Sequence, residues 1–439
     1  MFSRRAPVLV LLMTTAACTA PAGSPPGLAT VLTRGDDIIR LDVEGHDSTG
    51  RSITPDTPMR VASITKSFTA AAVLTLVDEG RVALDQPLVT YVQDFRMADE
   101  RAAAMTVRHL LNQTSGLADY TVDIAATQRA ADLAAYVAAL RRGALAATPG
   151  TRYAYCNVNY DLAARLIEVV DGRPFAEAMR ARVFAPLGMK DSAIGTTPAD
   201  GYISLFGWWI ARPELAGFRG GAGGAVTTAR DMGRWLISQT AHGSLLSPAS
   251  LREMHIPGSV ARGYAMGWGP ADVAGRTLLV HSGNLFTYTA VQALDPDSGE
   301  GWAVLTNSAA LGDPAFETLL ALVGKTEVSH SERPLVEAGL AATAIVSVLL
   351  ATIGVRRARR PRRLWRLVPP LLPLAVFATT PQWISMLTNG RTVTWAQMTY
   401  FPAPLTITLA IVALAGLATL LARLRWVQLS ASTLGARQP

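Results

Sequence analysis

The chain has 439 residues, enough for two or three domains and a sizeable core. Its net charge is +7, but residues 326–439 hold 12 Arg and 3 acidic residues, whereas residues 1–325 hold 28 basic and 30 acidic ones. Because the basic excess belongs to the tail alone, the charge distribution argues against nucleic-acid binding. The two cysteines, Cys18 and Cys156, exclude a disulfide framework.

The N-terminus is typical of a signal peptide over residues 1–20. Arg4 and Arg5 precede an apolar stretch at 6–17, which is too short to span a bilayer and ends in small residues. The letters "TAAC" before Cys18 also fit a lipoprotein signal, and ordinary cleavage near Ala20 fits as well. In both cases we expect export, followed by a Pro/Gly linker at 21–27.

Residues 28–325 are predicted to form one domain with both strands and helices. The segment "LATVLTRGDDIIRLDVEGHD" is typical of two strands around a Gly-Asp turn. A helix-rich region follows at about 63–240, and strand patterns return after 262 in "RTLLVHSG", "TYTAVQAL" and "GWAVLTNS". Strands at both ends with helices between them predict an α/β (α+β) fold with one sheet built from both ends and an inserted helical region.

The composition changes after a second predicted linker at 326–337. Three uncharged apolar segments, each close to bilayer length, predict three transmembrane helices at about 338–355, 367–387 and 402–422. Four prolines in the middle segment are expected to bend or interrupt it. Residues 423–439 then form a tail.

The charges beside these segments predict their orientation. The letters "RRARRPRR" at 356–363 follow the first segment, whereas the loop at 388–400 carries only Arg391. Because arginine-rich loops stay in the cytoplasm, we expect 356–363 and the tail inside and 28–330 and 388–400 outside. The sequence thus predicts a multi-pass protein of the cell membrane, with the lipid bilayer as a partner and the large domain outside.

The stretch "RVASITKSFTAAAVLTLVDEG" at 60–80 places Ser63 at the start of an apolar helix and Lys66 three residues later. Lysine is rare here, since only Lys66, Lys190 and Lys325 occur. Residues three apart share a helix face, so Lys66 can reach the Ser63 hydroxyl. An ammonium among apolar side chains is costly to desolvate, which favours the neutral, basic amine. Alone, however, Ser-x-x-Lys is more often a solvated helix face.

Two further elements carry polar groups with catalytic chemistry. Tyr155-Cys156-Asn157 precedes a predicted helix, and His281-Ser282-Gly283 ends a predicted strand. Taken singly, Tyr155 is more often a core aromatic and His281 a packing histidine. The order and spacing of the three elements are stronger evidence for a catalytic site than any single element.

Seven segments in this order resemble the serine β-lactamase-related family, which contains class C β-lactamases, D-alanyl-D-alanine carboxypeptidases, D-aminopeptidases and related esterases. The resemblance covers about 28–325 and implies an antiparallel sheet flanked by helices and a serine hydrolase acting on an amide or ester, such as a cell-wall peptide or small ester, with no cofactor. The segments are "RVASITKSFTAAAVLTLVDEGRVALDQPL", "MTVRHLLNQTSGLADY", "PGTRYAYCNVNY", "FAPLGMKDS", "GGAGGAVTTARDMGRWL", "YAMGWG" and "LLVHSGN".

The resemblance implies a role for each matching residue. Ser63 would be the acylated nucleophile, and Lys66 would help to deprotonate it. Tyr155 would pass the proton to the leaving group and activate water for deacylation. Asn157 would orient the substrate amide and hold Lys66, and the backbone N–H groups of Ser63 and Asn284 would form the oxyanion hole.

The His281-Ser282-Gly283 element departs from the β-lactamase pattern. His281 stands where β-lactamases have a lysine that binds the substrate carboxylate, so we expect weaker, pH-dependent carboxylate binding and a peptidase or esterase rather than a true β-lactamase. Cys156 replaces a more usual serine. The segment "NLFTYTA" after Gly283 replaces a glycine-rich turn and would reshape the pocket.

Other function classes remain as alternatives. A sensor that binds a cell-wall ligand, or is acylated by it without efficient turnover, would share the fold, but a pure binder would need none of Ser63, Lys66 and Tyr155. A Ser-His-Asp hydrolase is disfavoured because no G-x-S-x-G element occurs. The six histidines show no ligand spacing, so we expect no metal site.

Overall fold

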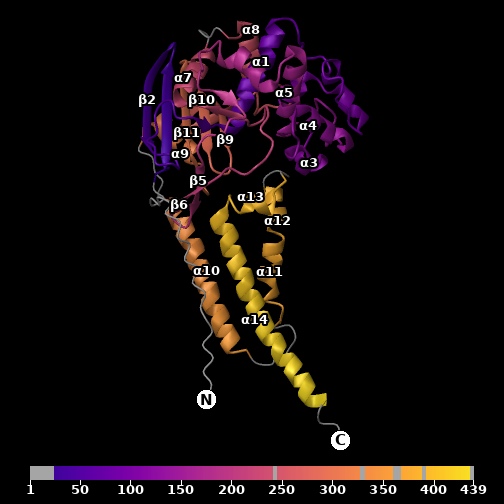
Figure 1. Cartoon of the computed structure of the whole chain (residues 1–439), viewed down its shortest axis with the longest axis vertical. Helices are drawn as coiled ribbons and strands as arrows, with labels where there is room; N and C mark the ends of the chain where they lie inside the picture. The colour runs from indigo at the N-terminus through magenta and orange to yellow at the C-terminus, as the bar shows by residue number, and fades with distance from the viewer. Residues whose placement is uncertain (1–23, 241–244, 327–331, 359–366, 388–391, 436–439) are drawn as a thin grey trace.

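The computed structural model describes residues 24–240, 245–326, 332–358, 367–387 and 392–435. The signal peptide predicted at 1–20, with Cys18, lies outside the described residues, as does most of the arginine cluster at 356–363. Figure 1 shows a large α/β domain with a group of long helices extending from one side of it.

A six-stranded sheet of order β2-β1-β11-β10-β9-β8 forms the centre of the domain, and every neighbouring pair is antiparallel. Leu28 on β1 lies opposite Thr306 on β11, so the two ends of the domain meet in this sheet. This confirms the predicted antiparallel sheet built from both ends. Its strands are β1 (Gly27–Arg34), β2 (Asp37–Gly45), β8 (Gly269–Val273), β9 (Arg276–Asn284), β10 (Thr289–Leu294) and β11 (Glu300–Thr306).

Helices cover both faces of the sheet. Successive side chains of a strand point to opposite faces, so Val291 of β10 packs under α9 (Pro314–Gly324), whereas Ala290 faces the main core. On that second face α7 (Ala229–Ser238) packs against β1 and β11. The result is a three-layer domain with helices on each side of one sheet (Figure 1).

The inserted region between β2 and β8 carries the remaining helices of the domain and all but one strand of two small sheets; the exception, β12, follows β11. Its helices are α1 (Thr65–Asp78), α2 (Val107–Leu111), α3 (Ile124–Gln128), α4 (Leu133–Ala139), α5 (Val158–Asp171), α6 (Phe175–Met179) and α8 (Pro248–His255). Strands β3 (Met59–Arg60), β7 (Ala225–Thr227) and β4 (Ala193–Ile194) form one small sheet; β12 (Ser308–Ala309), β5 (Gly201–Leu205) and β6 (Trp208–Arg212) form the other.

Helix α1 is buried on every side, as expected of a helix that is apolar all round. Phe68 makes edge-to-face contacts with Trp235 of α7, at 4.7 Å between ring centroids, and with Phe184 at 5.7 Å. Gln292 of β10 accepts a hydrogen bond from Trp235 Nε1 and donates one to Ser67 Oγ. This buried chain ties the sheet, α7 and α1 together.

The C-terminal part contains α10 (Glu332–Arg356), α11 (Leu371–Ala378), α12 (Thr380–Leu387), α13 (Trp395–Met398) and α14 (Ala403–Gly435). In the described part of the chain, Pro334–Arg356 and Ala403–Arg425 are long and apolar enough to cross a membrane. The middle segment predicted at 367–387 is interrupted, as its prolines predict, and forms two eight-residue helices rather than one continuous span. Prolines explain the division, because Pro370 caps α11 and Pro381 lies in the first turn of α12.

Two polar contacts attach these helices to the domain. Glu337 of α10 is buried and accepts hydrogen bonds from Ser204 Oγ and from Gly207 N, at 2.7 Å, in the β5–β6 hairpin. Arg212 of β6 donates to the Thr399 carbonyl at 2.7 Å. Helix α10 starts at Glu332, so its first residues occupy part of the segment that was predicted as a linker at 326–337. Glu337 fixes this first part of the helix to the domain.

Candidate active site

Ser63 lies in a short 3-10 helix, Ala62–Ile64, that leads directly into α1. Ala62 adopts φ +46, a left-handed conformation that is uncommon for a residue with a Cβ atom. Gly283 of β9 packs so closely here that a Cβ atom would lie 2.1 Å from the Val61 carbonyl oxygen. A glycine is thus required at 283 for the strand edge to reach the serine, and the conformation around Ser63 is constrained from both sides.

Lys66, the second residue of α1, is fully buried and points back to the serine. Its Nζ donates to Ser63 Oγ at 2.9 Å and to the Ala222 carbonyl at 2.7 Å. The same nitrogen lies 5.0 Å from the centroid of the Tyr155 ring. The structure therefore brings Ser63, Lys66 and Tyr155 together, as the sequence predicts.

The Tyr155-Cys156-Asn157 turn is fixed by Gln113, which the sequence analysis did not select. The Gln113 Oε1 atom accepts from the Cys156 N–H at 3.0 Å and from Asn159 Nδ2 at 2.5 Å. Asn157 caps α5, and its buried Oδ1 has no hydrogen-bond partner within the described residues. The hydrogen bonds of Lys66 go to Ser63 and Ala222, so the expectation that Asn157 holds Lys66 finds no support here.

Asp161 is an acidic residue of the site that sequence reasoning missed. Its Oδ1 accepts from the Ala222 N–H at 3.1 Å, and the carbonyl of the same residue accepts from Lys66. Gly221 allows this approach, because a Cβ atom there would lie 2.4 Å from the Tyr160 carbonyl oxygen. Burial raises the pKa of Asp161 to about 6, while the Ala222 N–H and the charge of Lys66 oppose that rise.

His281 is buried on β9 and uses both ring nitrogens within the protein. Its Nδ1 lies 2.8 Å from the Ser282 carbonyl, which can only accept, so Nδ1 carries the hydrogen. The Nε2 atom then accepts from the Tyr264 hydroxyl at 3.2 Å. Burial and the charge of Lys66 lower the pKa of His281 to about 3. The ring is therefore neutral at pH 7, and the lowered pKa moves the predicted pH dependence of carboxylate binding well below neutral pH.

These residues open onto one cavity of about 700 Å³. Ser63, Tyr155, Asn157, His281, Ser282 and Asn284 line it, whereas Lys66 and Gly283 are buried behind Ser63 and Val61. The apolar residues Ile124, Leu215, Phe218, Leu285 and Phe286 form much of its remaining wall. The residues predicted from three distant parts of the sequence thus share one hollow.

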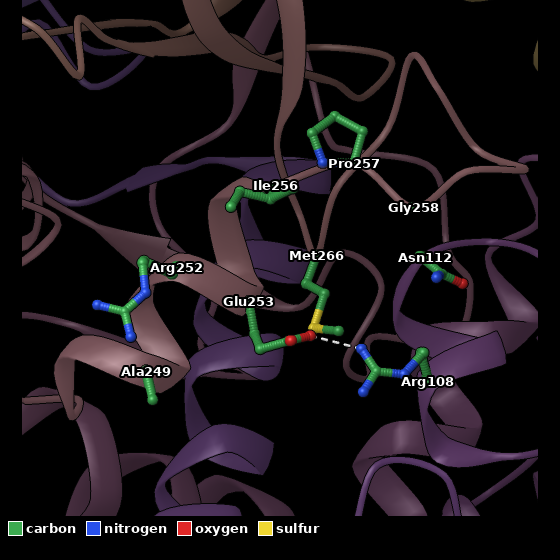
Figure 2. Close-up of a pocket in the computed structure, with 9 residues that line it drawn as sticks. All are labelled: Arg108, Asn112, Ala249, Arg252, Glu253, Ile256, Pro257, Gly258 and Met266. Atoms are coloured by element: carbon green, nitrogen blue, oxygen red, sulfur yellow. Dashed lines mark hydrogen bonds and ion pairs between the residues drawn. The ribbon is translucent and has the colours of Figure 1, made fainter.

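A second hollow of about 420 Å³ lies between α2 and α8 (Figure 2). Arg108 crosses it to pair with Glu253 at 2.5 Å and also pairs with Asp85 at 2.7 Å. None of its lining residues is among the catalytic candidates, and Arg108 and Glu253 pair with each other across it. The candidate active site is therefore the cavity at Ser63.

Comparison with known proteins agrees with this geometry. The family model described as Beta-lactamase matches residues 16–324. The chain belongs to the β-lactamase family. This confirms the predicted serine hydrolase of the β-lactamase-related group, since members that resemble the chain include an esterase and an amidase.

Three similar proteins illustrate the range of the family. Penicillin-binding protein 4 of Amycolatopsis lactamdurans is 31% identical over 300 residues, 60% of this chain and 75% of that protein. Esterase EstB of Burkholderia gladioli is 29% identical over 315 residues, 66% of this chain and 76% of that protein. The crystal structure of D-amino acid amidase from Ochrobactrum anthropi SV3 with D-phenylalanine matches with TM-score 0.57 and 27% identity, covering 69% of this chain and 93% of that one.

Replacing Asp161 tests its burial in the β-lactamase-like site. In the unfolded chain the carboxyl ionises near 3.8, whereas in the folded chain it ionises near 6. The folded state therefore keeps a proton that the unfolded state has lost, and stability falls as pH rises through this window, by about 3 kcal/mol. We therefore expect the free energy of unfolding of Asp161→Asn, relative to that of the wild type, to rise by about 3 kcal/mol between pH 4 and pH 7. Denaturant unfolding of the full chain in detergent measures this difference.

The comparison of the two proteins cancels the contributions of the buried histidines, which titrate in both. Glu253→Gln, at an exposed ion pair, is the matched control and should show little pH-dependent gain. A stability difference for Asp161→Asn that is constant from pH 4 to pH 7 would show that Asp161 is not a buried acid with a raised pKa.

Proposed function

We propose that the protein is a membrane-anchored, outward-facing serine hydrolase that cleaves an amide or ester, such as a D-amino-acid peptide or small ester, through an acyl-enzyme. The observation that carries the proposal is the 2.9 Å hydrogen bond between the fully buried Lys66 Nζ and Ser63 Oγ, which lines the cavity. A serine hydroxyl becomes a useful nucleophile only beside a base, and a neutral lysine amine has the lone pair to accept its proton.

The geometry supports a two-step reaction. Lys66 takes the Ser63 proton as Oγ attacks the substrate carbonyl, and the backbone N–H groups of Ser63 and Asn284 stabilise the oxyanion. The proton passes through Tyr155 to the leaving nitrogen or oxygen, leaving an acyl group on Ser63. Water, activated by the same groups, then releases the acid and restores the serine.

Asn157 supplies a reason to expect an amide as one substrate. Its Oδ1 is buried without a partner in the described part of the chain and belongs to the wall of the cavity. A buried acceptor without a partner costs roughly 1–3 kcal/mol, which a substrate N–H would recover. The amidase and esterase relatives also act on these two bond types by name.

The helices α10 and α14 support the membrane part of the proposal. Side chains of α10 such as Val346, Leu349 and Leu350 are 52%, 58% and 64% exposed. A surface of this kind is costly in water and is covered in a bilayer. Arg356 and Arg357 end the α10 helix on the side away from the domain, which favours the cytoplasm for that side.

Changing the nucleophile should abolish covalent labelling. A fluorophosphonate or penicillin probe should place its adduct on Ser63, as read by mass spectrometry of the digested protein. Ser63→Ala should lose the adduct, whereas Ser52→Ala, at an exposed serine outside the cavity, should keep it. An adduct that persists in Ser63→Ala would refute the assignment, and an adduct without turnover of any substrate would favour the sensor function.

Cysteine labelling on intact cells tests the orientation. Asp36→Cys lies in the exposed β1–β2 turn and should react with an impermeant maleimide without lysis, whereas Ala358→Cys, after α10, should react only after lysis. The native Cys156 is buried and gives little background. Labelling at 358 on intact cells would overturn the proposed orientation.

His281 should set the preference between charged and uncharged substrates. Both ring nitrogens of His281 are already bonded within the protein, whereas a lysine ammonium could give a substrate carboxylate a charge-assisted hydrogen bond worth roughly 1.5–3 kcal/mol. His281→Lys should therefore shift the ratio of kcat/KM values toward carboxylate-bearing substrates by about tenfold, or ~1.4 kcal/mol. The neutral variant His281→Gln is the control and should leave the ratio unchanged.

The pH dependence provides a second check on the same residue. Because burial and Lys66 hold the pKa of His281 near 3, the wild-type ratio should be the same at pH 6 and pH 8. Equal ratios for the wild type and His281→Lys, measured with a penicillin against an uncharged ester at pH 8, would show that residue 281 does not determine carboxylate recognition.

A further inference from the structure

One wall of the active-site cavity is formed by residues that lie outside the part of the chain matched by the family model. The family match ends at residue 324, yet Thr392, Thr394, Ala396 and Gln397 line the same cavity as Ser63 and Tyr155. These four residues belong to the segment that joins α12 to α14 and contains α13, here called the 392–400 segment. Figure 1 shows α13 between the domain and the long helices.

The 392–400 segment is docked against the domain next to the proposed oxyanion site. The Arg212 guanidinium donates to the Thr399 carbonyl at 2.7 Å and stacks 3.5 Å above the centroid of the Tyr400 ring. The Tyr400 ring in turn packs edge-on against Phe286, with centroids 5.9 Å apart. Phe286 follows Asn284 by two residues, so the segment contacts the strand end that bears the oxyanion N–H.

The segment is also rigid in itself. Thr394 and Gln397 form a reciprocal capping box: the Thr394 N–H donates to Gln397 Oε1 at 2.8 Å, and Thr394 Oγ1 accepts from the Gln397 N–H at 3.3 Å. Trp395 packs on Phe377 of α11 with ring centroids 4.8 Å apart. These contacts hold the cavity wall in one position relative to the apolar helices.

The same wall lies at the level where the apolar helices begin. The apolar segments start at Pro334 and Ala403, next to the domain, and the 392–400 segment directly precedes the second of them. Trp383, Trp395 and Phe401 are 58%, 41% and 43% exposed close to this level. Exposed tryptophans at the ends of apolar helices are typical of the membrane–water interface, so the cavity is placed at the bilayer surface.

We propose that the substrate is a lipid-anchored amide or ester, whose acyl chain stays in the outer leaflet while its polar end reaches Ser63 along the 392–400 segment. This rests on the proposed function. The apolar wall of Leu215, Phe218, Leu285 and Phe286 accommodates the part of the chain nearest the scissile bond. Retention of the chain in the bilayer raises the local substrate concentration without any charged contact.

The test uses the full chain in phosphatidylcholine vesicles and two substrates with the same scissile bond. Methylumbelliferyl butyrate is largely soluble, whereas methylumbelliferyl palmitate is held in the bilayer, and the corresponding p-nitroanilides cover the amide case. The wild type should cleave the palmitate with a specificity constant at least tenfold higher, and its rate should follow the mole fraction of palmitate in the bilayer.

Ala396→Trp places a large side chain on this wall of the cavity, at an exposed position in α13. It should lower the ratio of the palmitate to the butyrate specificity constant at least tenfold. Ala342→Trp, on the exposed surface of α10 and outside the cavity, is the matched control and should leave this ratio unchanged. Ala396→Leu is a smaller second variant, and the fluorophosphonate adduct on Ser63 reports whether each variant is folded.

The outcomes separate this inference from the proposed function. Butyrate hydrolysis with no preference for the palmitate, or an equal loss of both substrates in Ala396→Trp and Ala396→Leu, would overturn the lipid-anchored substrate alone. If no substrate is cleaved and Ser63 takes no adduct, the proposed hydrolase function fails as well.

Discussion

The burial of one amine governs the design of this domain. Lys66 is fully buried, and an uncompensated ammonium inside a protein is strongly disfavoured, so its surroundings must supply hydrogen bonds. They come from Ser63, one turn earlier, and from the Ala222 carbonyl in the glycine-rich loop. Helix α1 can hold Lys66 there only because the sheet, α5 and α7 enclose it on every side. The packing of the three layers thus keeps the Lys66 side chain buried next to Ser63.

The sequence predicted those features that depend on local spacing or alternation. Ser63 and Lys66 lie within one helical turn, and the strands at both ends of the domain alternate between two faces, so both were readable before the fold was known. Asp161, Gln113 and Tyr264 were not, because each acts through a partner distant in the sequence. Asp161 reaches Lys66 only through Ala222, 61 residues later, and Tyr264 matters only once β9 brings His281 against it.

In the C-terminal region, too, local sequence patterns did not predict contacts with distant parts of the chain. The hydropathy pattern correctly predicted the helices α10 and α14. It also predicted a single span at 367–387, because average hydropathy does not take into account that proline lacks a backbone N–H donor. No sequence pattern connected 392–397 with Ser63, more than 300 residues away. That connection is made by contacts between distant parts of the chain. Arg212 donates to the Thr399 carbonyl, Glu337 accepts from Gly207 N, and Tyr400 packs against Phe286.

The charges of the cavity explain why such a wall is useful. A lysine at position 281 would place a second buried amine near Lys66, whose charge when it is protonated lowers the pKa of His281, and two buried cations repel strongly. The chain instead has a neutral imidazole, saturated by the Ser282 carbonyl and the Tyr264 hydroxyl. Contacts that need no charge are available from apolar surface at Leu285 and Phe286 and from the wall at 392–397, beside Arg129 and Arg219, which also line the cavity.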